Sequence, residues 1–447
     1  MKCAGFLLLA GAAAAAAWAV AQERQGGGPP AVFRTDVPAH EIDVIEARPT
    51  DTSVTLSMMA ARETAATFSY QPGGAARGLR LPAGVPVEIE VMGLTPDRSY
   101  EYTIAAGKPL AAGRFRTARP AGATFAFAVQ ADSHLDGNTD GRVYANTLAN
   151  IVADQPDFLV DLGDTFMTEK YGAYRDSAPQ YLAQRYYLGL AGRTMAVFLA
   201  LGNHDGEVGW RTREPDMTAW ASGMRRKYFP PVQANHFYAA GPEKNSYYAW
   251  TWGDALFVVL DPFTETRDKP RTESEGWAWT LGREQYEWLR ATLAGSRARW
   301  RFVFIHHLVG GSSREARGGA EASVFFEWGG ANSDGTPGFV AHRRGWAMPI
   351  HDLLVAQHVA AVFHGHDHLY VRQERDGVVY QEVPQPSQAR GDRTDSAAEY
   401  GYRSGTLLGS SGHLRVSVSK TRTVVEYVKS RLSGANREVA DRYTLGR

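Results

Sequence analysis

Five short polar runs contain the side chains in this sequence that are best suited to metal chemistry. Carboxylate, amide and imidazole groups are typical ligands of first-row metal ions. Two such ions held ~3.5–4 Å apart can clamp the attacking and leaving oxygens of a displacement, and they lower the pKa of a bound water. The pattern therefore predicts a two-metal hydrolytic site. The runs are Asp132-Ser133-His134, Gly163-Asp164, Gly202-Asn203-His204-Asp205, His306-His307 and Gly365-His366-Asp367-His368.

The spacing within the runs indicates how they could bind metal. Asp164 stands alone behind a glycine that allows a close turn, which suits a carboxylate that bridges two ions. Asp132 and His134 are two positions apart, so in extended chain both point to one side and can reach one cation. His366 and His368 repeat that spacing.

Each run follows a stretch that has the composition of a buried strand. In open α/β sheets, ligands bind beyond the carboxyl ends of the strands. We therefore expect the five polar runs to meet at one rim. The predicted strands are Phe125–Val129, Phe158–Val160, Val197–Leu199, Phe302–Ile305 and Ala360–Phe363.

The series D-x-H, G-D, G-N-H-D, H and G-H-x-H resembles the calcineurin-like metallophosphoesterase superfamily. The resemblance implies an αββα sandwich of two packed sheets, whereas periodicity alone indicates only an α/β domain. It also implies two sets of metal ligands that share Asp164. The first set is Asp132, His134, Asp164 and His368, and the second is Asp164, Asn203, His306 and His366.

The fourth run leaves an alternative open. Members of the superfamily usually have proline two positions after the histidine, and here His306-His307-Leu308 has leucine. His306 is the favoured ligand, and His307 is an alternative ligand, a donor to a ligand, or a histidine of the pocket wall. His364 faces away from His366 if the strand continues, which favours a hydrogen-bonded core histidine.

His204 differs from the ligands, because Asn203 supplies the metal-binding carbonyl and leaves the next side chain free to face a leaving group. As an imidazolium it could stabilise phosphoryl charge and protonate the departing alkoxide. Asp205 could fix the tautomer of His204. It could also cap the following turn, which does not exclude the first role.

The N-terminus has the pattern of a secretory signal peptide over residues 1–21. Met1-Lys2 is a short positive start, Ala4 to Val20 is uncharged and apolar, and Ala19-Val20-Ala21 is a small-x-small cleavage signal. The alternative is an uncleaved membrane anchor, which the alanine and glycine content disfavours. We expect a secreted or periplasmic protein without stable membrane insertion after cleavage.

Composition limits the partners. The formal charge is zero, with 48 basic and 48 acidic side chains, and cleavage would remove only Lys2. The chain therefore lacks the polybasic character expected of a protein that binds duplex nucleic acid. Cys3 is the only cysteine, so the cleaved chain would have no disulfide and no cysteine ligand.

Residues 22–31 are polar and rich in glycine and proline, which is typical of a flexible leader. Residues 32–118 show short alternating strands between Gly and Pro turns, which predict an all-β sandwich. Its Gly93-Leu94-Thr95-Pro96 and Tyr100-Glu101-Tyr102 runs resemble a fibronectin type III-like domain, with a core or corner tyrosine. Such a domain precedes the catalytic part in purple acid phosphatases. Residues 119–122 are the expected hinge, and 122–447 the metallophosphoesterase domain.

Within the second part, helices are expected at 143–154, 283–293 and 349–357, and a closing hairpin at 414–418 and 423–428. Two long segments, 206–245 and 310–345, contain many aromatic and arginine side chains and are expected to be binding loops. For any single aromatic residue in them, packing within the loop is the more common role.

One position departs from purple acid phosphatases. Their second motif is G-D-x-x-Y, with a tyrosine that binds iron and gives the colour, and here Met167 occupies that place. A thioether is a poor ligand for a hard cation. We therefore expect a colourless enzyme with two metal ions of uncertain identity, Fe, Mn, Zn or Co.

The leading hypothesis is a secreted or periplasmic phosphatase, in which metal-bound hydroxide attacks the phosphorus of a small-molecule phosphate ester. The alternatives are a phosphodiesterase or nucleotidase that uses the same site, and a non-catalytic binding or adhesion protein. The intact ligand set argues against the last of these, because a retired site would be expected to have lost some of its ligands.

Overall fold

Two mixed sheets form the centre of the structure, a computed structural model that describes residues 32–210, 215–242 and 246–446. The part from Phe33 to Arg447 forms one compact unit. The predicted signal peptide and leader, residues 1–31, lie outside the described residues. None of the helices in the described ranges is long and apolar enough to cross a membrane.

The larger sheet has nine strands. Its centre is parallel, because β8, β9 and β10 run in the same direction. Their carboxyl ends therefore lie at one edge. In spatial order the strands are β21 (Val439–Leu445), β20 (Thr423–Lys429), β19 (Gly412–Val418), β8 (Phe125–Gln130), β9 (Phe158–Asp161), β10 (Ala196–Leu199), β1 (Ile42–Ala47), β2 (Ser53–Ala60) and β5 (Val87–Met92).

The second sheet has eight strands, and its centre is also parallel from β13 to β17. Its order is β11 (Tyr238–Ala240), β12 (Tyr248–Trp252), β13 (Ala255–Val259), β14 (Trp300–Phe304), β15 (Ala361–His364), β17 (Val378–Glu382), β16 (Leu369–Arg375) and β18 (Thr406–Gly409).

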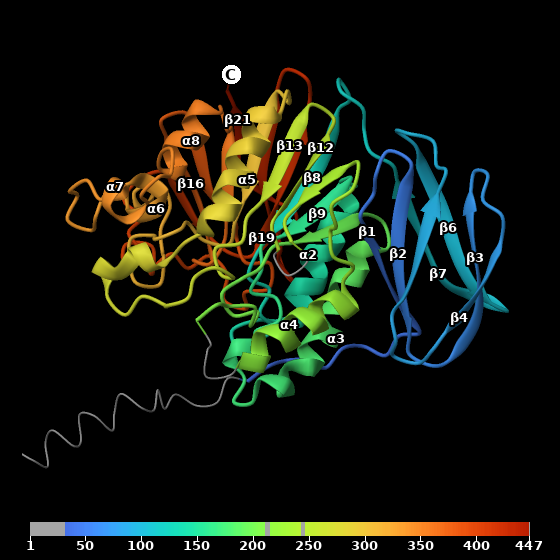
Figure 1. The fold of residues 1–447 in the computed structure, drawn as a ribbon. Helices are drawn as coiled ribbons and strands as arrows, with labels where there is room; N and C mark the ends of the chain where they lie inside the picture. Colours follow the sequence, from blue (N-terminus) through green and yellow to red (C-terminus); the bar gives the residue numbers. More distant parts are fainter. Residues whose placement is uncertain (1–31, 211–214, 243–245, 447) are drawn as a thin grey trace, which may run out of the picture. The chain divides into compact units, whose positions relative to one another are not determined.

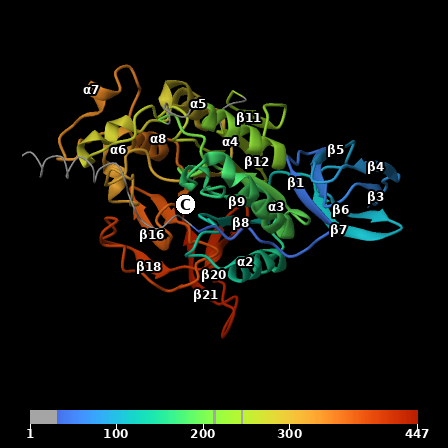
Figure 2. The same cartoon turned by 90° about the horizontal axis from the view of Figure 1, so that it is seen from below.

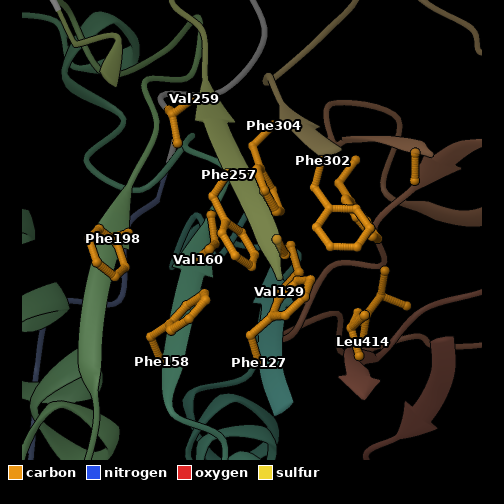
Figure 3. Close-up of a cluster of buried hydrophobic side chains, with 14 of the residues drawn as sticks. Phe127, Val129, Phe158, Val160, Phe198, Phe257, Val259, Phe302, Phe304 and Leu414 are labelled. Atoms are coloured by element: carbon orange, nitrogen blue, oxygen red, sulfur yellow. The ribbon is translucent and has the colours of Figure 1, made fainter. Parts of the chain in front are cut away.

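Aromatic and branched side chains fill the space between these two sheets. Phe127 and Phe158 of the nine-stranded sheet contact Phe257 of the eight-stranded sheet, with ring centroids 5.1 Å apart in each pair. Figure 3 shows these rings together with Phe302, Phe304 and Leu414 in one buried cluster. Because interiors pack at crystal-like density, this core fixes the relative position of the two sheets and of their strand ends.

Helices cover the outer face of each sheet (Figure 1). Helix α2 (Gly141–Asp154) and helix α3 (Ala178–Gly192) pack on the nine-stranded sheet. Helix α5 (Gly282–Gly295) and helix α8 (Ile350–Ala356) pack on the eight-stranded sheet. The four layers are the predicted αββα sandwich. The three helices and the closing hairpin that the sequence predicts are confirmed by α2, α5, α8 and the pair β19–β20.

A seven-strand sandwich forms at the N-terminal side. One of its sheets has the order β4 (Arg77–Leu81), β3 (Thr64–Gln71), β6 (Ser99–Ala106) and β7 (Lys108–Arg116). The other sheet of the sandwich is formed by β1, β2 and β5, and the two sheets share an apolar core. The Tyr100 hydroxyl accepts a hydrogen bond from the Thr95 N–H at 2.8 Å, which is the contact expected of a corner tyrosine.

The sequence does not reveal how this sandwich joins the rest of the chain. Strand β1 pairs in parallel with β10, with Glu46 opposite Ala196, so the three-strand face continues into the nine-stranded sheet. Figure 2 shows β1 beside α3. The Tyr102 hydroxyl also donates to the Arg193 carbonyl at 3.0 Å. The predicted hinge is tied as well, because Arg119 donates two hydrogen bonds to Asp157.

One expected loop contains a helix instead. Within 206–245, α4 spans Pro215–Tyr228. Asp216 lies in its first turn and Arg225, Arg226 and Lys227 lie in its last, which complements the helix dipole. The prediction of a continuous binding loop is therefore wrong for this stretch, because the aromatic and glycine residues around it obscured the helical composition. Segment 310–345 contains only short helical turns, including α6 (Phe326–Gly329) and α7 (Phe339–His342).

Candidate metal centre

The five polar runs follow five strand ends, as the sequence predicts. Strands β8, β9, β10, β14 and β15 end at Gln130, Asp161, Leu199, Phe304 and His364. The runs begin between one and three residues later, and their side chains come together at one rim of the two sheets. Because β8–β10 are parallel to one another and β14 is parallel to β15, the carboxyl ends of these strands lie at this rim.

The backbone at the rim is not extended. The φ angles of Asp132, His134, Asp164, His366 and His368 lie between 48° and 82°. The prediction that D-x-H and H-x-H act as extended pairs is therefore wrong, because these ligands are aimed by left-handed turns. Non-glycine residues in such conformations cost roughly 1–3 kcal/mol each and tend to occur at functional sites.

Two glycines allow the turns to touch. A Cβ on Gly163 would lie 2.2 Å from the Gly202 nitrogen, and a Cβ on Gly202 would lie 2.0 Å from the Asp164 nitrogen. Any side chain at either position would push the two turns apart. This confirms the expected close turn before Asp164, and it explains why Asn203 and Asp164 come within reach of the same space.

The first group of donors contains Asp132, His134 and His368. The Asp132 Oδ1 lies 3.6 Å from His134 Nε2 and 3.5 Å from His368 Nε2. The other oxygen of Asp132 accepts the His366 N–H at 2.8 Å. That bond leaves Oδ1 directed at the two imidazole nitrogens.

The second group contains Asp164, His306 and His366. His306 Nε2 lies 3.2 Å from His366 Nδ1 and 3.4 Å from Asp164 Oδ2. The Asn203 Oδ1 joins this group, 3.0 Å from His306 Nε2. The structure thus gathers all seven residues that the resemblance implies as ligands.

Asp164 lies between the groups. Its Oδ2 is 3.6 Å from His134 Nε2 in the first group and 3.4 Å from His306 Nε2 in the second. Its Oδ1 is held by the His204 N–H at 2.8 Å. A single carboxylate oxygen therefore faces both sets of nitrogen donors, which is the position required of a bridging ligand.

The hydrogen bonds of the histidines show that lone pairs converge here. Because a carbonyl can only accept, His306 Nδ1 donates to Leu162 O at 2.9 Å and His366 Nε2 donates to Glu315 O at 2.7 Å. In their neutral forms, which metal binding requires, the rings direct the lone pairs of His306 Nε2 and His366 Nδ1 at each other. Such an arrangement is stable only with a cation or a shared proton between them, so the residues fit a metal ion.

The first group shows the same feature. His134 Nδ1 is 3.2 Å from Asp136 Oδ2, an orienting contact of the kind that metal-bound histidines make. Within the described part of the chain, the buried His134 Nε2 and Asp132 Oδ1 have no hydrogen-bond partner. Buried polar atoms are rarely left unsatisfied. Metal coordination would satisfy both atoms.

The carboxylates and histidines at the rim stabilise each other's charged forms. Burial alone would raise the pKa of Asp164, but His306 beside it holds that pKa well below its usual range. Burial would likewise lower the pKa of His306, but Asp164 and Asp132 raise it to about 9. The carboxylates are therefore ionised and negative, as cation binding requires.

The structure favours His306 over His307 as the ligand. His307 belongs to neither group. Its ring packs against Phe263 and Trp279, with centroids 5.0 Å and 4.7 Å away, and its Nδ1 donates to the Leu308 carbonyl. It is a histidine of the pocket wall. His364 is a core histidine, since its Nδ1 lies 2.7 Å from Glu382 Oε2.

His204 stands beside the centre but outside both groups. Its Nε2 is 3.9 Å from Asp164 Oδ2, and its ring is 6.4 Å from that of His134. Burial lowers the pKa of His204 to about 3, and Lys170 and Lys269 add to this effect. The ring is therefore neutral near pH 7 without substrate. A bound phosphate would favour its charged form.

Asp205 holds the two turns together. Its Oδ1 accepts the Thr165 and Phe166 N–H groups at 2.8 and 2.7 Å, and its Oδ2 accepts the Gly202 N–H at 2.8 Å. The hydrogen bonds described for Asp205 include none to His204. None of these hydrogen bonds comes from the turn that follows Asp205, so the contacts show neither expected role, and Asp205 instead positions Asp164.

Other sequence predictions concern side chains around the rim. Met167, at the position of the iron-binding tyrosine, is buried with a left-handed backbone. Trp328 packs inside, where its Nε1 donates to Tyr380. Arg343 pairs with Glu327 and donates to the Trp277 carbonyl. These contacts confirm internal packing for Trp328 and Arg343.

Sequence reasoning missed the residues that orient the ligands. Asp136 was detectable, because a carboxylate two positions after a ligand histidine can reach its ring. Arg317 was not. It donates to the His366 carbonyl and lies 3.0 Å from Asp367 Oδ1, although about fifty positions separate them in the chain. No local pattern marks such a contact.

Comparisons with known proteins agree with this geometry. The family model described as calcineurin-like phosphoesterase matches residues 125–370, which is more than half of the chain. The solved structure of PhoD has a TM-score of 0.64 at 14% identity, covering 90% of this chain and 89% of that one. A purple acid phosphatase, PPD1 from seeds of yellow lupin (Lupinus luteus), has a TM-score of 0.63 at 14% identity, covering 91% and 75%. No curated protein sequence matches the chain.

Proposed function

Because this chain belongs to the calcineurin-like phosphoesterase family, and is thus a metal-dependent phosphoric ester hydrolase, we propose that it is a dinuclear phosphatase acting on small-molecule phosphate esters. The observation that carries the dinuclear proposal is the position of Asp164 Oδ2, within 3.6 Å of nitrogen donors from two groups. A single-metal site would not need two donor groups that share one oxygen.

In this proposal, Asp132, His134 and His368 hold one ion, Asn203, His306 and His366 hold the other, and Asp164 bridges them. When bound, the ions supply Lewis acidity and lower the pKa of coordinated water toward neutrality. The protein holds the donors in place through the strained turns and the hydrogen bonds of Asp136, Leu162 and Glu315. Fe, Mn, Zn or Co suit this mixture of ligands.

His204 is the candidate for a catalytic group that does not bind metal. It is neutral in the free site and next to the carboxylate bridge. A phosphate dianion bound there raises the proton affinity of His204. The ring can therefore take up a proton when the substrate binds and give that proton to the leaving oxygen. Lys170 and Lys269 lower the pKa of His204, which keeps the ring neutral until a phosphate binds.

The alternatives receive less support. A nucleotidase would stack a base on an aromatic side chain, but Trp328 is buried in the protein interior, and the ring of Tyr400 in the cavity beside His368 already has Arg317 over it at 4.5 Å. A phosphodiesterase with the same donors differs only in accepting a second ester group. A non-catalytic binding protein has no need of the strained and converging donors that the rim presents.

We also propose that residues 1–21 direct the chain to a secreted or periplasmic location. N-terminal sequencing of the protein recovered outside the cytoplasm should begin at Gln22. An intact Met1 terminus on an exported or membrane-bound form would support the anchor instead.

The proposed activity is tested by metal analysis together with two chromogenic substrates. Hydrolysis of p-nitrophenyl phosphate faster than bis(p-nitrophenyl) phosphate, with two metal equivalents per chain, is expected. A preference for the diester would establish the phosphodiesterase. Absence of hydrolysis with Mn, Fe, Zn and Co supplied in turn would contradict a phosphatase.

A further inference from the structure

A cavity of about 270 Å³ lies next to the candidate metal centre and reaches it through His368. Six residues of its lining lie after strands β8, β15 and β18 and in the segment between β17 and β18. These residues are Asn138, His368, Gln388, Arg390, Arg393 and Ser410. The volume suits the organic part of a small phosphate ester whose phosphate is bound at the rim.

The segment that carries Arg390 is fastened to the metal centre. Gln385 Nε2 donates to the Asp132 carbonyl at 2.7 Å, and Ser387 Oγ donates to the Ser133 carbonyl at 2.8 Å. The Ala389 N–H then donates to Asn138 O at 3.0 Å. The backbone before Arg390 is therefore fixed relative to the first metal-ligand run.

The backbone after Arg390 is fixed as well. The Asp392 N–H donates to the Ser410 carbonyl at 2.6 Å, and the Ser410 hydroxyl donates to the His368 carbonyl at 2.8 Å. A Cβ on Gly391 would lie 2.5 Å from Ser410 O, so only glycine allows this close approach. The backbone at Arg390 is thus anchored on both sides, and its exposed side chain extends from this support at the cavity.

The cavity has an uncompensated positive charge. Arg393 is paired with Asp395 at 2.7 Å, and Asp367 is paired with Arg317 at 3.0 Å. Within the described part of the chain, the guanidinium of Arg390 has neither a carboxylate partner nor a hydrogen bond. Its planar donors match a carboxylate or phosphate in a two-point contact.

We propose that the preferred substrates are phosphate esters whose alcohol portion carries a second anionic group, and that Arg390 binds this group in the cavity. The inference rests on the proposed phosphatase function, because it places the scissile phosphate at the metal centre. A neutral alcohol portion would leave the guanidinium hydrated and would gain nothing from it.

Three substrates with the same three-carbon backbone test the charge preference. They are glycerol 3-phosphate, 3-phosphoglycerate, in which a carboxylate replaces the terminal alcohol, and glycerol 1,3-bisphosphate. The wild-type enzyme should favour an anionic member over glycerol 3-phosphate by roughly tenfold in kcat/KM, the range of one charge-assisted hydrogen bond. The carboxylate and bisphosphate arms distinguish the two sources of the charge.

Arg390→Gln should remove most of this preference, chiefly through KM, and Arg390→Lys should restore part of it. The double variant Arg393→Gln with Asp395→Asn is the matched control, since it removes an arginine of the same cavity together with the carboxylate that neutralises it, and its effect on the ratio should be smaller. Thermal unfolding of each variant shows whether it is folded.

An unchanged preference in Arg390→Gln, or no preference in the wild type, would overturn the proposal while leaving the phosphatase intact. If the wild type hydrolyses neither these three nor p-nitrophenyl phosphate, the proposed function fails. Calorimetric binding of 3-phosphoglycerate and glycerol 3-phosphate to wild type and Arg390→Gln then decides the inference, and equal affinities would overturn it.

Discussion

Two of the regions in which the protein buries carboxyl groups are the metal centre and the junction where the N-terminal sandwich joins the nine-stranded sheet, and the candidate ligands Asp132 and Asp164 behave in the opposite way to Glu46. At the metal centre, Asp132 and Asp164 are 0–1% exposed, and the neighbouring histidines lower their pKa values. At the junction, Glu46 is 1% exposed, and burial raises its pKa well above the ordinary value.

The backbone differs in the same way. Glu46 lies in the regular strand β1, opposite Leu56 of β2. Asp132 and Asp164 lie in left-handed turns after their strands. Burial of an acid is therefore a weak sign of function. What marks the metal centre is burial combined with strained turns and with nitrogen donors that face the same oxygen.

The largest effect should come from the bridge. Asp164→Asn keeps the size of the side chain but removes the charge between the two groups. Turnover should fall by at least ~10³, because clamping of the two ions is lost. The change is measured as kcat on p-nitrophenyl phosphate, with circular dichroism as the test of folding. Glu46→Gln, an equally buried amide substitution, is the matched control and should keep its activity.

Near-parental activity of Asp164→Asn with both ions retained would contradict the assignment of the bridge. Loss of activity in Glu46→Gln to the same extent would show that burial, rather than convergence on the rim, decides the effect.

His204→Ala should have the next largest effect. The variant should keep two ions per chain but slow the hydrolysis of esters with poor leaving groups by ~10²–10⁴, the usual range of general acid help. Esters of p-nitrophenol should be slowed less, because nitrophenolate departs without a proton. Alkyl and nitrophenyl phosphates are compared in the same assay.

Equal losses on both substrate types would point to binding of the phosphate group by His204. Loss of an ion from His204→Ala would show that the histidine is a ligand.

The presence of Met167 instead of a tyrosine should have a smaller effect, which is seen in the visible spectrum. With Met167 at the position of the tyrosine, the enzyme loaded with iron should lack the tyrosinate charge-transfer band of purple acid phosphatases. Absorbance is recorded before and after loading with iron. A strong band that disappears in Tyr171→Phe would show that a different tyrosine binds the metal.

The smallest effect should be at the junction. Because the pKa of Glu46 is raised in the folded state, the folded protein holds this proton more tightly than the unfolded chain. Its contribution to stability is complete below the unfolded pKa and is lost as pH rises toward the folded pKa. Glu46→Gln should therefore raise Tm at pH 8 by roughly 2 °C relative to wild type, and by less at pH 4.

A Tm difference that is the same at both pH values would mean that Glu46 titrates alike in the folded and unfolded chains. A larger difference at pH 4 than at pH 8 would contradict the raised pKa.

Much of the metal centre could be predicted from the sequence. The ligand types and their order after Phe125–Val129 and the other apolar runs were enough, because strand ends and ligand chemistry are local properties. The αββα layers followed from the family resemblance. The αL turns at Asp132 and His368 could not be predicted, since they depend on hydrogen bonds between distant segments, such as the His366 N–H to Asp132.

Other features of the fold could not be predicted from the sequence for a similar reason. The pairing of β1 with β10 joins residues about 150 positions apart, and no local periodicity encodes it. Segment 385–392 carries none of the motifs that the sequence analysis used, although Gln385 and Ser387 donate hydrogen bonds to the first ligand run. Helix α4 was missed because its mean hydropathy is low and it lies among loop-forming residues.

The central claim is that two metal ions share Asp164. It is tested most directly by metal analysis and anomalous diffraction of the protein loaded with Mn or Zn. We expect two ions per chain, ~3.5–4 Å apart, one beside His134 and His368 and the other beside His306 and His366. One ion per chain under saturating metal, or two ions that do not both contact Asp164, would contradict the account.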